Sequence, residues 1–266
     1  MEYRLFFTCL ILTVLLMQSA DAGEKKTVKK RYSPCRISYP SNARVEWACY
    51  RLKKRETLES LFGEQWRDVA HFNRMDRRHA KPGATLKVPK RLDDIKDYTP
   101  LSATFPPAEK DEKFILVDLT EQFLGAYEYG RLVFSFPIAS GDKNFKTPTG
   151  QFRVTAYNRN HVSSIYKIEN TTKPYPMNYA LRFYISSENV DYWIHGRDLP
   201  GYPASHGCVG LYDEEMQKRY YGDPKVPVLQ GAKQLFQWVI GTNPDDGKFH
   251  TLKNGPRVLV VGKSPI

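Results

Sequence analysis

The sequence predicts a mostly β protein whose larger part is an antiparallel β-sandwich with a few helices, preceded by a small βααβ unit. Residues 113–141 hold three runs of β-branched, aromatic and leucine residues separated by turn-like breaks. Further strand-like runs follow at 150–160, 176–196 and 255–263. Residues 214–222 and 230–241 instead have helical spacing and end at glycine. The 266 residues suffice for one large domain or two unequal ones.

Residues 1–22 are predicted to be a secretory signal peptide. Arg4 precedes an apolar run at 5–17, and Ala20 and Ala22 fit an A-x-A cleavage site. The run is short for a membrane span, which favours cleavage over the alternative of an uncleaved anchor. We therefore expect export to the periplasm or cell envelope, with no stable membrane insertion after cleavage.

The chain is basic, with a formal net charge of +11. Residues 23–43 are polar and basic, which predicts a flexible segment at the start of the mature chain. A basic protein can bind nucleic acid, anionic lipid or an acidic polymer. Export favours a cell-wall polymer among these partners, and we expect no nucleic acid.

Residues 44–90 form the predicted βααβ unit. Strand-like alternation opens the unit, and Thr57 is placed to cap a first short helix. A second helical segment covers residues 66–73, and a Pro-Gly turn leads into a strand at 85–88. Residues 91–111 carry charges and prolines without an apolar period, which predicts a linker.

The βααβ unit resembles a LysM module, a small peptidoglycan- and chitin-binding domain. The matching stretches are KKRETLESLF, WRDVAHFN and KPGATLKVP. Arg55 and Glu56 stand where that family usually has Gly-Asp. A unit kept only for packing or positioning is therefore the open alternative to a sugar-binding module.

The cysteines divide unevenly along the chain. Cys9 leaves with the signal peptide, and in an oxidising compartment a disulfide between Cys35 and Cys49 is the simplest pairing. Cys208 is then an odd thiol, for which a catalytic nucleophile is one explanation. A buried inert cysteine, or a pairing of Cys208 with one of the other two, stays open.

Cys208 lies in the stretch YPASHGCVGLYD, and His195 ends a strand-like run thirteen positions before it. A cysteine nucleophile reacts as the thiolate and needs a base or cation nearby, which His195 or His206 can supply. The N–H groups of Gly207 and Cys208 are candidate oxyanion donors. Zinc is the competing interpretation, but this spacing offers three ligands at most. We expect neither a metal nor an organic cofactor.

The stretches IHG and PASHGCVGL, with TPTG at 147–150, are similar to the signature of L,D-transpeptidases, the YkuD-like catalytic domain of the ErfK/YbiS/YcfS/YnhG type. The resemblance spans about residues 112–263, and we place the catalytic domain at 112–266. It implies a mostly antiparallel β-sandwich with the catalytic cysteine at one end of a cleft.

The resemblance also implies roles for the motif residues. Cys208 would be the nucleophile and His195 the general base and acid, oriented by the carbonyl of Gly196. Gly207 and Cys208 would form the oxyanion hole. His206 would hold the cleft and the cysteine loop in shape, and it is the rival candidate for the base.

Substrate-binding candidates surround this motif. Ser205 would support the cysteine loop, and Tyr202 and Trp193 are placed to stack on substrate, although aromatic residues near a cleft are often core. Gly210 stands where the family usually has arginine or asparagine. Arg197 is a candidate to compensate for that missing side chain.

The implied reaction begins with attack on the third-residue carbonyl of a peptidoglycan tetrapeptide stem. D-Alanine leaves, a thioester forms on Cys208, and an amine of a second stem peptide or of an acceptor protein takes the acyl group. Two alternatives stay open. One is a carboxypeptidase or hydrolase of the same fold, in which water is the acceptor. The other is a catalytically degenerate peptidoglycan-binding protein.

Overall fold

The computed structural model describes residues 33–168 and 170–266, which fall within one compact unit. The predicted signal peptide, residues 1–22, lies outside the described residues, as do residues 23–32 of the basic segment at 23–43. Among the helices of the described part, none combines the length and the apolar character that a membrane span needs.

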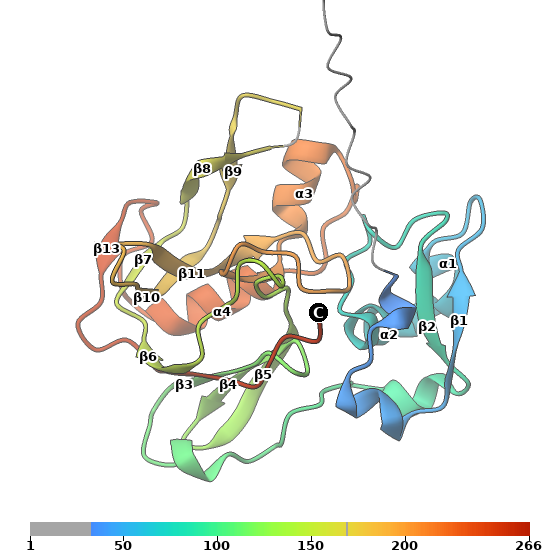
Figure 1. Ribbon diagram of the computed structural model, residues 1–266, viewed down its shortest axis with the longest axis horizontal. Coiled ribbons are helices and arrows are strands. Elements are labelled where there is room, and N and C mark those ends of the chain that lie inside the picture. Colours follow the sequence, from blue (N-terminus) through green and yellow to red (C-terminus); the bar gives the residue numbers. More distant parts are fainter. Residues whose placement is uncertain (1–32, 169) are drawn as a thin grey trace, which may run out of the picture. The chain divides into compact units, whose positions relative to one another are not determined.

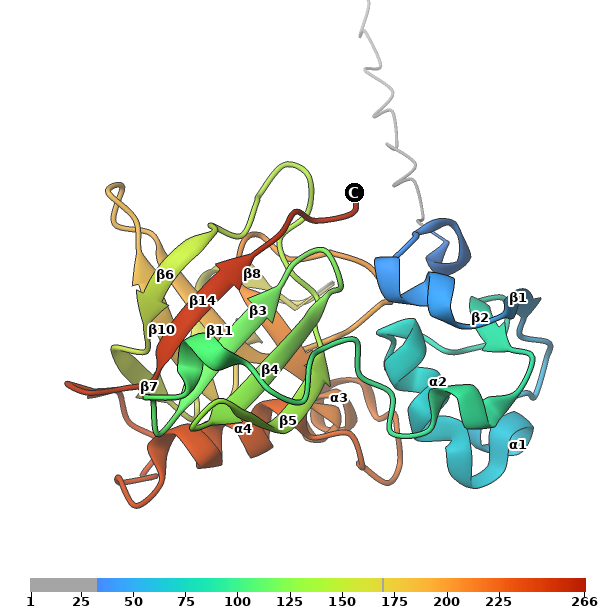
Figure 2. The same ribbon diagram turned by 90° about the horizontal axis from the view of Figure 1, so that it is seen from below.

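The predicted fold class is confirmed: the described strands include two five-stranded sheets packed as a sandwich. The first sheet has the order β5-β4-β3-β14-β6, and Figure 2 shows these strands side by side. Its strands are β5 (Arg131–Pro137), β4 (Phe123–Glu128), β3 (Phe114–Asp118), β14 (Arg257–Val261) and β6 (Gly150–Arg153).

The second sheet has the order β12-β11-β10-β7-β13 (Figure 1). Its strands are β12 (Val209–Tyr212), β11 (Asp191–Arg197), β10 (Ala180–Ile185), β7 (Ala156–Asn158) and β13 (His250–Thr251). A separate two-stranded hairpin pairs β8 (Val162–Lys167) with β9 (Pro174–Pro176).

The core lies between the two five-stranded sheets. Ile115 and Leu124 of the first sheet join Ile194 and Leu211 of the second in one buried cluster. Helix α4 (Gly231–Ile240) adds its apolar face to the same cluster, whereas α3 (Glu214–Tyr221) follows β12 directly. Two strand pairs, β14 with β3 and β11 with β12, run parallel. The other strand pairs of the two sheets are antiparallel, as expected for a mostly antiparallel sandwich.

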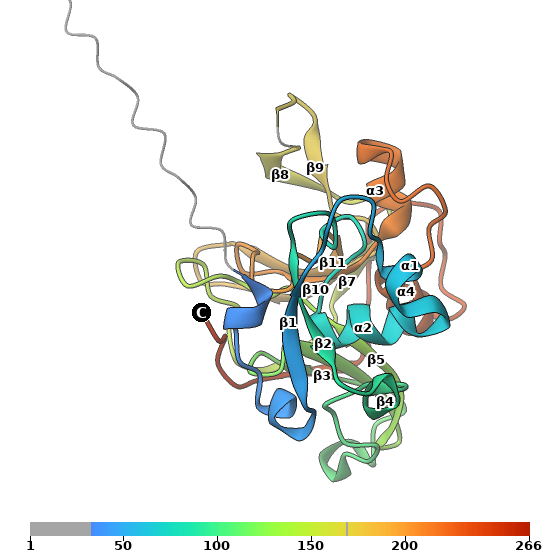
Figure 3. The same cartoon turned by 90° about the vertical axis from the view of Figure 1, so that its right-hand side faces the viewer.

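The small unit has the predicted order of elements: β1 (Trp47–Arg51), α1 (Leu58–Phe62), α2 (Trp66–Asn73) and β2 (Thr85–Pro89), which Figure 3 shows from one side. Strands β1 and β2 pair antiparallel. Thr57 caps α1 by accepting the Ser60 N–H at 3.1 Å, as an N-cap threonine does.

The segment at 91–111, predicted to be a linker, is packed rather than extended. It contains short 3₁₀ helices, η4 (Leu92–Ile95) and η5 (Pro106–Ala108), and Ile95 is fully buried. The ring of Phe105 lies 5.5 Å from that of Phe114. Apolar side chains at irregular spacing thus anchor a segment whose sequence has no regular period.

Candidate active site

Strands β11 and β12 bring His195 and Cys208 to one face of their sheet. The two strands are parallel, with His195 opposite Gly210. Side chains alternate along a strand, and Ile194 and Val209 point into the core. His195 and Cys208, each one residue away from these, therefore share the opposite face.

His195 is held as a neutral imidazole. Its side chain is 4% exposed, and its Nδ1 lies 2.8 Å from the Gly196 carbonyl oxygen. Burial and the nearby charge of Arg197 lower the pKa of His195 to about 3. Because a carbonyl oxygen can only accept, Nδ1 carries the proton and Nε2 is left able to accept one. This is the tautomer that a general base requires.

Gly196 has no room for a side chain. A Cβ at this position would lie 2.4 Å from Asp213 Oδ2. Asp213 caps helix α3 by accepting the Met216 N–H at 2.9 Å, and it accepts a hydrogen bond from Asn178 Nδ2 at 3.1 Å. Asp213 and Asn178 therefore support the backbone that orients His195. Sequence reasoning missed both, although an aspartate just before a helical run is an N-cap signal.

Cys208 is a protonated thiol in this environment. It lies against Trp193 and Met177, and burial raises the pKa of its thiol. A backbone hydrogen bond from Trp193 and the charge of Arg197 act in the opposite direction. The sulfur therefore needs a base to remove its proton when it attacks. Trp193 itself is only 3% exposed. It therefore packs against the thiol and offers almost no surface on which a substrate could stack.

Ser205 organises the turn that leads into Cys208. Its Oγ accepts the Gly207 N–H at 3.0 Å and donates to the Cys208 carbonyl. Thr147 Oγ1 donates to the Gly207 carbonyl at 2.8 Å. Because the Gly207 N–H is already bound to Ser205, the predicted oxyanion role of Gly207 does not fit this arrangement. Ser205 is correspondingly a support of the loop and not a contact for substrate.

The two candidate histidines occupy different environments. His206 is exposed, and its ring lies 4.6 Å from that of Phe145 and 4.2 Å from that of Tyr166 in β8. His195 shares the face of the thiol, whereas His206 belongs to an aromatic group beside it. Tyr202 is half-buried in the loop between β11 and β12.

Gly210 makes room for Arg197. A Cβ at position 210 would lie 1.8 Å from Arg197 Cδ and 2.0 Å from its Cγ. The guanidinium of Arg197 donates to the carbonyls of Asp198 at 3.1 Å and Ala204 at 3.2 Å. Arg197, predicted to bind substrate, is thus tied to the loop between His195 and Cys208.

Cys35 and Cys49 are both free cysteines in the structure. Cys35 Sγ donates to the Leu86 carbonyl at 3.1 Å. Burial and a hydrogen bond with Cys49 raise the pKa of Cys35 to about 12. The two thiols are therefore neighbours, and their oxidation to a disulfide stays a prediction.

One group of ligand-type side chains lies outside the Cys208 site. Asp76, His79 and Asp198 have ligand atoms within 4.8 Å of one another. Arg78 binds Asp198 at 3.1 Å, and Gln217 Nε2 donates to Asp76 at 2.7 Å and to Asp198 at 2.9 Å. Because these donors already bind both carboxylates, we interpret the group as an ion-pair and hydrogen-bond network.

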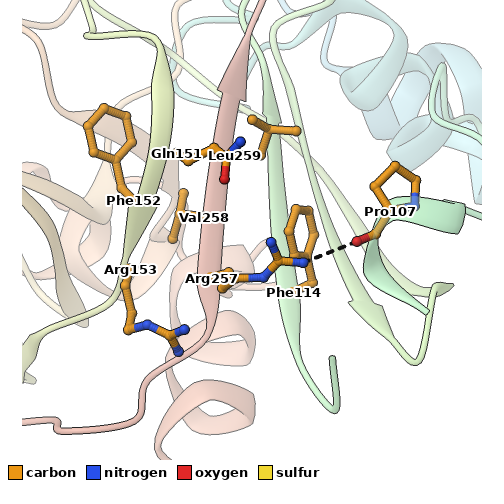
Figure 4. Close-up of a pocket in the computed structure, with 8 residues that line it drawn as sticks. All are labelled: Pro107, Phe114, Gln151, Phe152, Arg153, Arg257, Val258 and Leu259. Carbon is orange, nitrogen blue, oxygen red and sulfur yellow. Dashed lines mark hydrogen bonds between the residues drawn. The ribbon is translucent and has the colours of Figure 1, made fainter. Parts of the chain in front are cut away.

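A surface hollow is also separate from the Cys208 site (Figure 4). Its lining comprises Pro107, Phe114, Gln151, Phe152, Arg153, Arg257, Val258 and Leu259. Arg257 donates to the Pro107 carbonyl at 3.1 Å, and Arg153 donates to the Gly255 carbonyl at 2.6 Å. Arg257 therefore ties the first sheet to η5, and Arg153 ties β6 to the segment before β14.

Comparison with known proteins finds one family model that matches just under half of the chain. Residues 112–243 match the family model for YkuD, the L,D-transpeptidase catalytic domain. The matched segment contains β3 through α4 and both His195 and Cys208. No curated protein matches the sequence.

Solved L,D-transpeptidase structures are similar at low identity. The one from Stackebrandtia nassauensis is 20% identical, with a TM-score of 0.40 over 77% of this chain and 69% of that one. The one from Xylanimonas cellulosilytica is 22% identical, with a TM-score of 0.39 over 73% of this chain and 79% of that one. L,D-transpeptidase 1 of Mycobacterium tuberculosis is 17% identical, with a TM-score of 0.36, and this alignment covers 56% of this chain and 61% of the length of that relative.

Proposed function

We propose, from the L,D-transpeptidase catalytic domain that residues 112–243 match, that this protein is an exported cysteine L,D-transpeptidase acting on peptidoglycan stem tetrapeptides. The observation that supports this reading most directly is the register of β11 and β12, which pairs His195 with Gly210 and begins at Val209, the residue after Cys208. The hydrogen bond from His195 Nδ1 to the Gly196 carbonyl supports it further, because it presents Nε2 as an acceptor.

In the proposed first step, His195 Nε2 takes the thiol proton as Cys208 Sγ attacks the carbonyl carbon of the third stem residue. The oxyanion that forms is stabilised by backbone N–H donors, for which Cys208 N–H is the remaining candidate. The carbon–nitrogen bond then breaks, and the D-alanine amine leaves with the proton from His195. A thioester is left on Cys208.

In the second step, an amine attacks the thioester and passes a proton to His195, which returns it to the Cys208 sulfur. The product is a 3→3 cross-link or a protein attached to the stem. Water in place of the amine gives a tripeptide, which is the carboxypeptidase or hydrolase outcome. The lowered pKa of His195 and the raised pKa of Cys208 favour a neutral pair at rest, so in this proposal proton transfer accompanies attack.

Incubation with a disaccharide-tetrapeptide, followed by mass spectrometry of the intact protein, would test this proposal. The wild type is expected to gain an acyl adduct on Cys208, and Cys208→Ala to gain none. His195→Ala should slow adduct formation by roughly 10²–10⁴-fold, the usual range for a general base. His206→Ala, the matched histidine control, should slow it less than about tenfold, since the His206 ring packs with Phe145 and Tyr166 and is not the base of this proposal.

The products separate the alternatives. Dimeric muropeptides indicate transpeptidation, and free tripeptide indicates hydrolysis. A folded wild type that forms no adduct would support the degenerate peptidoglycan-binding protein instead.

Location and anchoring complete the proposal. We infer that residues 1–22 direct export to the periplasm or cell envelope and that the LysM-like unit contacts peptidoglycan. The apolar run at 5–17 and the net charge of +11 support these two inferences. A secreted chain that still begins at Met1 would contradict cleavage.

A further inference from the structure

Residues 198–208 form the connecting loop, which runs from the end of β11, the strand of His195, to Cys208. Its backbone pairs with the small N-terminal unit. The Leu199 N–H donates to Asp76 Oδ2 at 2.6 Å, and the Asp76 N–H donates to the Leu199 carbonyl at 2.9 Å. Met75 and Pro200 form an antiparallel bridge beside them. Asp76 therefore satisfies both backbone groups of Leu199.

Side chains reinforce this pairing. Leu199 is fully buried and belongs to the hydrophobic cluster of the small unit, together with Val69 and Phe72. The Tyr39 hydroxyl donates to the Gly201 carbonyl at 3.1 Å. A loop residue from the larger part of the chain thus completes the core of the small unit.

Asp76 is fixed from several sides. Its carboxylate is fully buried and accepts the His79 N–H at 2.8 Å and Gln217 Nε2 at 2.7 Å. Burial by itself would raise the pKa of Asp76, but the charge and side chain of His79, with the Leu199 and His79 N–H groups, lower it. The carboxylate therefore stays ionised and holds one geometry.

The connecting loop is also braced from within. Arg197 spans it by donating to the carbonyls of Asp198 and Ala204, and Ser205 closes the turn onto Cys208. The contacts with the small unit fall between these braces, at Leu199 to Gly201. Loss of the external contacts would leave the middle of the loop without its apolar anchor.

We propose that Asp76 is a positioning residue for the active site: through Leu199 it holds the connecting loop and so fixes the placement of the partly exposed Cys208 relative to His195. The small unit is then part of the catalytic scaffold. This inference rests on the proposed function for its turnover measurement, but the placement of the thiol can be measured without any peptidoglycan substrate.

The experiment uses the mature chain with Cys35→Ser and Cys49→Ser, so that Cys208 is its sole thiol. Asp76→Ala removes the acceptor of the Leu199 N–H, and Asp93→Asn is the matched control, an exposed carboxylate of η4 in the same part of the chain. Three quantities are measured: iodoacetamide alkylation of Cys208 against pH, kcat and KM for the tetrapeptide, and the melting temperature.

In Asp76→Ala the thiol should become more accessible and less well placed. Alkylation at neutral pH is expected to rise at least threefold, with the pH midpoint shifted downward, while kcat falls at least tenfold and KM changes less than threefold. Asp93→Asn should match the parent in all three. Because partial unfolding would also raise alkylation and lower turnover, both are measured at a temperature where the melting curve shows the Asp76→Ala variant to be fully folded.

An Asp76→Ala variant that melts lower but keeps the parent's alkylation profile would overturn the proposal. If this variant does not fold, Tyr39→Phe decides, because it removes only the hydroxyl bond to Gly201. It should shift alkylation and kcat in the same directions by a smaller factor, and parent-like values would overturn the proposal. If the parent shows no turnover, the proposed function fails. The alkylation profiles still test whether Asp76 positions Cys208.

Discussion

At the scale of single residues, Gly210 and Arg197 act as a pair. A methyl group at 210 would overlap the Arg197 side chain, which would have to release the carbonyls of Asp198 and Ala204. Overpacking of this kind costs about 1–3 kcal/mol. The glycine is therefore explained by the arginine beside it, and an arginine from β11 occupies the space that a side chain on β12 would use.

We predict that Gly210→Ala lowers the free energy of unfolding by about 1–3 kcal/mol and slows acylation of Cys208. In Arg197→Ala the overlapping Cγ and Cδ are absent, so adding Gly210→Ala to it should cost less than about 0.5 kcal/mol. Urea unfolding of the four proteins in this cycle measures the coupling. Additive effects would mean that Arg197 and Gly210 do not share this space.

His195 makes a second residue-scale prediction, on pH and stability. Its folded pKa is about 3, whereas an unfolded histidine titrates near 6.5. Between these values the unfolded chain binds a proton that the folded chain does not. Folding is therefore weakened as the pH falls from about 6.5 towards 3, by about 1.4 kcal/mol per pH unit from this group.

His195→Asn lacks this titration. The difference in unfolding free energy between wild type and His195→Asn should stay constant above about pH 7 and fall steadily below about pH 6. Urea denaturation at several pH values measures it. A difference that stays constant down to about pH 5 would show that His195 is not held neutral.

At the scale of elements, the strands and helices around the site could be predicted from sequence, but their pairing could not. The apolar run before His195 and the helical period after Asp213 are local signals. The parallel pairing of β11 with β12 depends on the path of the connecting loop, which its residues do not specify. A stretch rich in glycine and proline reads as a surface turn, yet Leu199 within it is fully buried.

The same limit applies to the residues of the site. Cys208 and His195 could be named from their motif, and their shared face follows from strand alternation. The engagement of the Gly207 N–H by Ser205 and the burial of Trp193 depend on contacts across the sheet and the turn. Such contacts leave no period in the sequence, so the sequence alone could not show that the Gly207 N–H is engaged or that Trp193 is buried.

At the scale of the whole molecule, the small unit and the larger part share buried contacts. Arg74 reads in the sequence as an ordinary residue after a helix, yet its side chain is fully buried. It pairs with Glu121 at 3.2 Å and lies 3.9 Å from the centre of the Tyr39 ring. A buried guanidinium that lost its partner would cost several kcal/mol, so these contacts oppose separation of the two parts.

We therefore predict that residues 33–266 unfold in a single cooperative transition. One hydrophobic cluster contains Val69 and Phe72 of α2 together with Leu199 and Tyr212 of the larger part, and the Tyr212 hydroxyl donates to the Met75 carbonyl at 3.1 Å. Scanning calorimetry should give one peak whose calorimetric and van't Hoff enthalpies agree. Leu199→Ala removes a side chain shared by both parts and should lower that peak as a whole, at a cost of about 2–5 kcal/mol. Two resolved peaks, or a variant that shifts only one of them, would show instead that the small unit is an independently stable module.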